Sequence, residues 1–154
     1  MELSDILTPE AIKSVGKSVS KKRVLQEMAG LAATIHEIDG DLAFNALQER
    51  ETLGPTGVGE GVAIPHARIA GLEKVVGIFY RLEKPLDYDA VDRHPVDLVF
   101  ALFAPEGSGV EHLKALALVS RLLRDQATRS KLRSNDEPST LFAIMTEVAT
   151  PKAA

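Results

Sequence analysis

The sequence contains no cysteine among its 154 residues. This absence excludes a disulfide framework, a thiol nucleophile and a thiolate metal site. Basic residues are outnumbered by acidic ones, and the net charge of −4 argues against a general nucleic-acid-binding protein, which usually has a basic balance. No apolar run approaches the roughly 20 residues of a membrane-spanning helix, and the opening Met-Glu-Leu-Ser-Asp shows no signal peptide. We therefore expect a cytoplasmic protein with neither a nucleic-acid partner nor a membrane partner.

Length and composition favour a single domain. A chain of this length can bury a substantial core, and its hydrophobic share of 45% and charged share of 26% are ordinary for a soluble globular protein. The sequence shows no internal repeat and no low-complexity linker. We expect residues 1–150 to form the domain and residues 151–154 to be a disordered tail.

Stretches with helical spacing alternate with stretches rich in β-forming residues. The spacing of apolar residues predicts a helical turn over 3–7 and helices over 24–35 (with Ser20 as the N-cap), 42–50, 110–124, 127–133 and 138–148. Strands are expected over 11–15, 57–66, 75–82 and 96–103, the last being apolar enough to be buried on both faces. Interleaved helices and strands predict an α/β fold, in which a mixed parallel and antiparallel sheet is sandwiched by helices.

The most informative segment runs from Thr56 to Arg68, where glycines at alternate positions precede Ile-Pro-His. Read as one strand, this segment has its valines and isoleucine on one face and its glycines on the other. A face of bare backbone indicates the close approach of another backbone or of a ligand. Because Pro65 lacks a backbone N–H, we expect the strand to end there with His66 at its end, where scaffolds of this type carry functional groups.

Four histidines are present, and none has the spacing of a helical metal pair, so no metal site is expected, although one assembled from separate segments stays open. His36 is expected on the surface at a helix end, and His94 in a polar loop. His112 falls in the first turn of a predicted helix, where the dipole disfavours its charged form; spacing alone favours a partly exposed helix residue. His66 could also be a structural residue that is hydrogen-bonded in a turn at the strand end. The glycines and proline before it, however, constrain the backbone more than such a turn requires.

A single histidine held at a fixed, exposed position suits nucleophilic chemistry, because imidazole forms covalent intermediates near neutral pH, including phosphohistidine. Such a site needs one ring nitrogen held by a hydrogen bond and a cationic group for the phosphoryl oxygens. Arg50 and Arg68 flank the segment, and the hydroxyl of Thr56 lies beside its glycines. The glycines lack the Gly-Lys-Ser/Thr ending of a nucleotide-binding loop, so no nucleotide cofactor is expected and the phosphate has to come from another phosphoprotein.

The run from Arg50 to His66 closely resembles the active-site segment of the IIA domains of the bacterial phosphotransferase system, of the fructose/mannitol type. Residues 95–105 and 111–116 also resemble that family, and the resemblance covers about residues 3–148. It departs from the family at Pro55-Thr56, where the family often has Ser-Thr, and at Ala67, where the family often has glycine. The first departure removes a hydroxyl donor and the second adds a methyl group at the mouth of the site.

The resemblance implies a phosphotransferase with a mixed sheet flanked by helices and three catalytic residues. His66 matches the histidine that accepts a phosphoryl group on Nε2 from an HPr-type phosphocarrier protein. His112 matches the second histidine of the site, which replaces the interpretation from spacing alone, and Arg50 matches the family's arginine. No cofactor and no metal are implied.

Residues 3–7 and 20–25 resemble those of the nitrogen-regulatory IIA proteins, which are free-standing regulators. Since the sequence shows no fused HPr, IIB or membrane IIC segment, we expect a regulatory switch whose targets include proteins such as sensor kinases or potassium transport systems. Two alternatives stay open. One is a sugar-specific IIA component that passes phosphate to a IIB domain, and the other is a regulatory binding module without covalent chemistry.

Overall fold

Six strands form one mixed sheet, in which β6 is the central strand. β5 runs antiparallel to β6 on one side, and β1 runs parallel to β5 at that edge. On the other side β3 and β4 pair with β6 in parallel, one after the other along its length, and β2 runs antiparallel to β3. The strands are β1 (Ile12–Val15), β2 (Gly57–Gly59), β3 (Val62–Ala63), β4 (His66–Ile69), β5 (Val76–Leu86) and β6 (Val96–Pro105).

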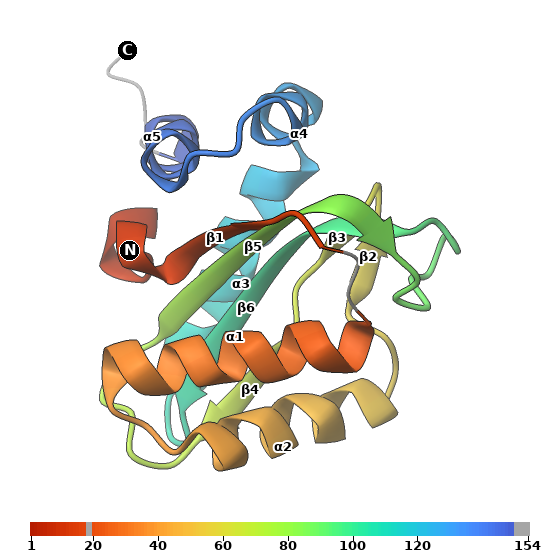
Figure 1. Cartoon of the computed structure of the whole chain (residues 1–154). Helices are drawn as coiled ribbons and strands as arrows, with labels where there is room; N and C mark the ends of the chain where they lie inside the picture. The colour runs from red at the N-terminus through yellow and green to blue at the C-terminus, as the bar shows by residue number, and fades with distance from the viewer. Residues whose placement is uncertain (18–19, 150–154) are drawn as a thin grey trace.

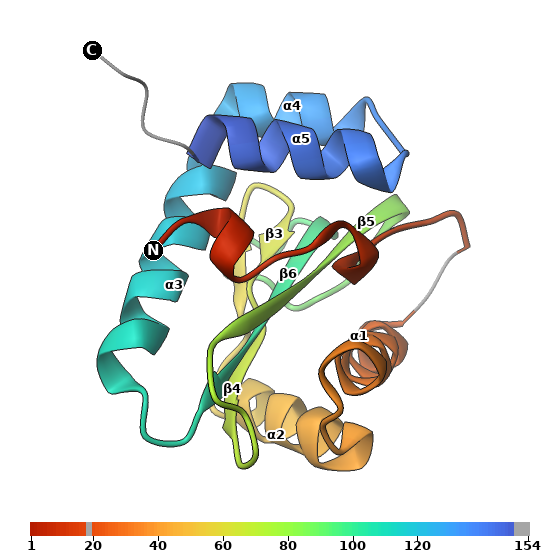
Figure 2. The same ribbon diagram turned by 90° about the vertical axis from the view of Figure 1, so that its left-hand side faces the viewer.

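Helices cover both faces of this sheet. α1 and α2 pack side by side on one face, and α3, α4 and α5 lie across the other (Figures 1 and 2). The expected α/β fold, with a mixed sheet between helices, is therefore confirmed. In chain order the helices are the 3-10 turns η1 (Leu3–Asp5) and η2 (Pro9–Ala11), then α1 (Lys21–His36), α2 (Gly40–Thr52), α3 (Gly109–Arg124), α4 (Gln126–Arg133) and α5 (Pro138–Ala149).

The structure is a computed structural model that describes residues 1–17 and 20–149. The tail expected at 151–154 therefore lies outside the described residues, and the domain boundary at 150 stays a prediction. Within them, the expected cap of α1 is confirmed, because the Ser20 hydroxyl accepts a hydrogen bond from the backbone N–H of Arg23 at 3.1 Å. β6 is also as predicted: residues 98–104 are completely buried, as they must be in a strand covered on both faces.

The glycine-rich segment is a hairpin followed by a separate strand, and the prediction of one strand is wrong. The chain reverses at Glu60 and Gly61, whose φ angles of 58° and 78° are both positive, as the two central residues of a type I′ turn require. Val58 is consequently exposed while Val62 is buried, so these two side chains do not share the expected face. The alternation was misleading because it continues unchanged across a tight turn.

His66 begins β4 instead of ending the preceding strand. The chain leaves β3 at Ala63, passes through Pro65, whose carbonyl oxygen accepts from the N–H of Leu102, and then pairs again with β6. The expected close approach of another backbone is present at Gly57, where an added Cβ would lie 2.9 Å from the Cα of Ala90. These two features fix the loop before the histidine and the strand that carries it.

Candidate functional site

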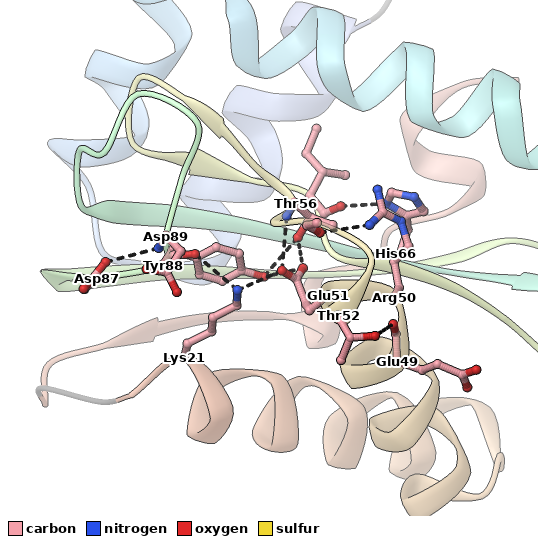
Figure 3. Close-up of polar contacts among 12 residues, drawn as sticks. Lys21, Glu49, Arg50, Glu51, Thr52, Thr56, His66, Asp87, Tyr88 and Asp89 are labelled. Atoms are coloured by element: carbon pink, nitrogen blue, oxygen red, sulfur yellow. Dashed lines mark hydrogen bonds and ion pairs between the residues drawn. The ribbon is translucent and has the colours of Figure 1, made fainter.

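His66 lies half-buried beside the central strand, opposite Leu102 of β6. Its Nδ1 lies 2.8 Å from the carbonyl oxygen of Ile64, two residues earlier (Figure 3). A carbonyl oxygen can only accept a hydrogen bond, so Nδ1 carries the hydrogen and the neutral ring keeps its lone pair on Nε2. The nitrogen that is available as a nucleophile is therefore Nε2.

The surroundings of His66 keep its ring neutral. Burial is the main cause that lowers its pKa, and the guanidinium of Arg50 lowers it further. The hydrogen bond to the Ile64 carbonyl and the carboxylate of Glu51 act in the opposite direction without reversing the shift. A lowered pKa leaves the Nε2 lone pair free of a proton at neutral pH, as nucleophilic attack demands.

His112 lies next to His66, although 46 positions separate them in the sequence. It occupies the first turn of α3, is buried with 7% of its surface exposed, and its ring centroid is 5.5 Å from that of His66, with the rings 71° apart. Burial, followed by the charges of His66 and Arg68, lowers its pKa. The partly exposed residue suggested by spacing alone is therefore not what the structure contains.

Arg50 lies in the last turn of α2 and lines the same hollow as His66. Its Nη1 donates to the carbonyl oxygen of Gly54 at 3.0 Å, which holds the side chain across the loop that leads into β2 (Figure 3). The hollow has a volume of about 350 Å³ and is open to solvent. Its lining consists of Arg50, Pro55, Thr56, Val58, Ile64, His66, Leu116, Ala117 and Ser120.

The structure thus brings the three predicted site residues together: Arg50 and His66 share one hollow, and His112 contacts His66. Thr56, whose hydroxyl lies beside the glycines in the sequence, also lines that hollow. Its hydroxyl donates to the carboxylate of Glu51. Arg68, the other candidate for the phosphoryl oxygens, contacts His112 through its Nε at 3.3 Å.

A polar cluster around Glu51 supports the loop at the site, and no sequence motif predicted it. The carboxylate of Glu51 accepts from the Thr56 hydroxyl, from the Thr56 N–H at 3.1 Å and from the hydroxyl of the buried Tyr88 at 3.2 Å. Lys21 forms an ion pair with it at 2.8 Å (Figure 3). Glu51 and Thr56 belong to one segment, but Lys21 and Tyr88 come from two others, so no local motif marks the cluster.

The other two histidines lie outside this hollow, and His36, which was expected on the surface, is half-buried. His36 ends α1, and the side chain of His94 is 74% exposed beside Asp92. In the part of the chain that the structure describes, no three histidine or acidic side chains are arranged to hold a metal ion. No helix within residues 1–17 and 20–149 is long and apolar enough to cross a membrane.

Known proteins resemble this chain over nearly its full length. The family model described as "Phosphoenolpyruvate-dependent sugar phosphotransferase system, EIIA 2" matches residues 5–148. A nitrogen regulatory protein of Bradyrhizobium diazoefficiens is 47% identical over 145 residues, which are 94% of this chain and 95% of the relative. A fructose-specific EIIA component of Haloferax volcanii is 34% identical and covers 96% and 99% of the two chains. The crystal structure of nitrogen regulatory protein IIA-Ntr from Neisseria meningitidis superposes with a TM-score of 0.86 at 35% identity, over 94% of this chain and 99% of that one.

Proposed function

This chain belongs to the EIIA 2 family of the phosphoenolpyruvate-dependent sugar phosphotransferase system, and from that premise we propose that it carries a phosphoryl group on Nε2 of His66. One observation carries the proposal: the hydrogen bond from Nδ1 to the Ile64 carbonyl leaves Nε2 as the ring nitrogen with a free lone pair. The hollow beside His66 supplies room for the phosphoryl group, and Arg50 supplies a positive charge.

The transfer requires no group beyond these side chains and a phosphorylated donor. The Nε2 lone pair forms a bond to the phosphorus of the donor as the donor's own N–P bond breaks, and that electron pair returns to the donor imidazole. Nδ1 keeps its hydrogen and its bond to the Ile64 carbonyl, so positive charge that develops in the ring is stabilised. Within the described residues Arg50 uses one N–H, on Gly54, and its remaining donors suit the phosphoryl oxygens.

The donor in this proposal is an HPr-type phosphocarrier protein, and the output is regulatory. The nitrogen regulatory relative at 47% identity supports this role more strongly than the fructose-specific relative at 34%. A phosphoryl group adds roughly two negative charges to the site, and thereby changes which partner can dock there. Proteins such as sensor kinases or potassium transport systems would be the targets. A sugar-specific component that transfers the group to a IIB domain is the second candidate, favoured by the fructose-specific relative.

The test is phosphorylation with phosphoenolpyruvate, enzyme I and an HPr-type donor. We expect a mass gain of one acid-labile phosphate that is absent in His66→Ala and retained in the matched control His94→Ala, whose side chain lies in an exposed loop. Nitrogen-15 spectra of the product should place the phosphorus on Nε2. A phosphorylated His66→Ala protein, or a folded wild-type protein that gains no phosphate from competent donors, would contradict the proposal, and the latter would favour a non-covalent binding module.

His112 has a supporting part in the same reaction. We expect His112→Ala to slow the transfer without unfolding the chain, because it removes a hydrogen-bonding group whose ring lies 5.5 Å from that of His66. Rapid-quench measurement of the transfer rate, with circular dichroism to check the fold, decides this point. An unchanged rate in a folded variant would remove His112 from the site.

A further inference from the structure

The contact between Arg68 and His112 determines which neutral tautomer His112 adopts. Arg68 lies on β4, two positions after His66, and its Nε is 3.3 Å from Nδ1 of His112. The Nε of an arginine always carries a hydrogen and never accepts, so Nδ1 of His112 must be the acceptor. A neutral histidine that accepts through Nδ1 carries its hydrogen on Nε2. The contact therefore selects one of the two neutral tautomers of His112.

The Nε2 of His112 is buried and has no hydrogen-bond partner among the residues that the structure describes. Buried polar groups in proteins are almost always hydrogen-bonded, so an unpaired one beside a nucleophile calls for a specific explanation. The only reacting group next to it is His66, whose ring makes an edge-on contact with that of His112. An oxygen of a phosphoryl group on His66 is a suitable acceptor for this unused donor.

We propose that Arg68 is a positioning residue for phosphoryl transfer, which fixes His112 as the Nε2–H tautomer so that Nε2 donates to a phosphoryl oxygen on His66. This inference rests on the proposed function of His66 and adds to it the group that sets the form of its neighbour. Arg68 acts through His112, since its own contact is with Nδ1 of that ring.

The same contact opposes protonation of His112. An imidazolium carries a hydrogen on Nδ1, which would point at the Nε–H of Arg68 and bring two positive charges together. The site therefore offers the phosphoryl group a neutral donor at His112, while the positive charge comes from Arg50. A carrier has to release its phosphoryl group, and a second cation at His112 would hold the group more tightly and slow its onward transfer.

The first arm of the test measures the tautomer and uses no phosphate. In long-range ¹⁵N–¹H spectra of the unphosphorylated protein, we expect His112 as the Nε2–H form and His66 as the Nδ1–H form. Arg68→Met keeps an unbranched side chain that reaches as far as Nε and removes the donor, and we expect His112 to become a mixture of tautomers while His66 is unchanged. Arg68→Lys, which keeps a cation with N–H donors, should restore part of the Nε2–H form.

The second arm measures the rate of transfer from the donor protein. Arg68→Met should slow it roughly threefold to tenfold, the range for one misdirected neutral hydrogen bond, and Arg68→Lys should recover part of that loss. Arg121→Met, at an exposed position on the same helix as His112, is the matched control and should change neither readout.

The outcomes separate this inference from the proposed function. Wild-type His112 in the Nδ1–H form, a tautomer unaffected by Arg68→Met, or a changed tautomer with an unchanged transfer rate would each overturn the role of Arg68. A wild-type protein that accepts no phosphate would overturn the proposed function, and the spectra would still report whether Arg68 sets the tautomer.

Discussion

Replacing Gly57 by alanine should destabilise the loop that precedes His66. A Cβ at this position would lie 2.7 Å from the Cβ and 2.9 Å from the Cα of Ala90, and 3.3 Å from Cδ1 of Tyr88. Two of these distances are too short for carbon atoms, and one of them involves backbone, so the chain around Ala90 has to move away. That movement would strain the hydrogen bond from the Val91 N–H to the Gly57 carbonyl and displace Tyr88 from Thr56.

Overfilling a packed interior by one methyl group costs about 1–3 kcal/mol. In a domain of this size each kcal/mol lowers Tm by about 2–4 °C, so we expect Gly57→Ala to melt several degrees below the wild type. Its rate of phosphoryl transfer should also fall, because Thr56 lines the hollow beside His66.

Gly30→Ala is the matched control, and its effect should have the opposite sign. Gly30 lies in the middle of α1, and outside its own neighbourhood in that helix no atom lies within 4 Å of the position its Cβ would take. Alanine is favoured over glycine inside a helix by about 0.5–1 kcal/mol, so this variant should be slightly more stable and fully active. Thermal and urea unfolding of both variants check the pair, and a Gly57→Ala protein with wild-type stability and transfer rate would refute the packing argument.

Two further predictions concern buried polar groups. Glu51→Gln removes the charge that Lys21 pairs with and weakens the acceptor for Thr56, so urea denaturation should show a free energy of unfolding lower by about 1–3 kcal/mol. The control Glu49→Gln, at an exposed position, should leave the free energy of unfolding unchanged. Equal stability of the two variants would show that the cluster does not stabilise the fold. Acidification should destabilise the fold, because burial lowers the pKa values of His36, His66 and His112 and the unfolded chain therefore binds protons more readily. The free energy of unfolding should be fully retained above the unfolded histidine pKa of about 6.5 and fall below it; a urea midpoint that rises between pH 7.5 and pH 5.5 would contradict the direction of these shifts.

Local patterns in the sequence predicted the parts of the fold that local forces determine. Ser20 could be predicted as a cap because capping depends on a contact within a few residues, here with the N–H of Arg23. β6 could be predicted as a strand buried on both faces because its apolar run is continuous. The Arg50 to His66 segment predicted the candidate site for the same reason, because its arginine, loop and histidine lie in one stretch of the chain.

The parts that could not be predicted depend on contacts between distant segments. The turn at Glu60 and Gly61 keeps the alternation of a single strand, so the hairpin is visible only in the antiparallel pairing of β2 with β3, which joins the sheet by pairing with the distant β6. The contact of Arg68 with His112 joins segments 44 residues apart, and no spacing rule connects them. Tyr88 and Glu51 are 37 residues apart and meet only because the sheet brings their loops together.

Both histidines of the site are attached to the same strand. His66 pairs directly with Leu102 of β6, and His112 follows the end of β6 at Pro105 after one short loop and the start of α3. Their separation is consequently set by the main chain of the most deeply buried strand. Under the proposed function, the geometry of the site is assembled when the protein folds, and docking of a partner would require little further rearrangement. If the chain carries a phosphoryl group as proposed, such preorganisation would lower the entropic cost of binding each partner and would favour fast association.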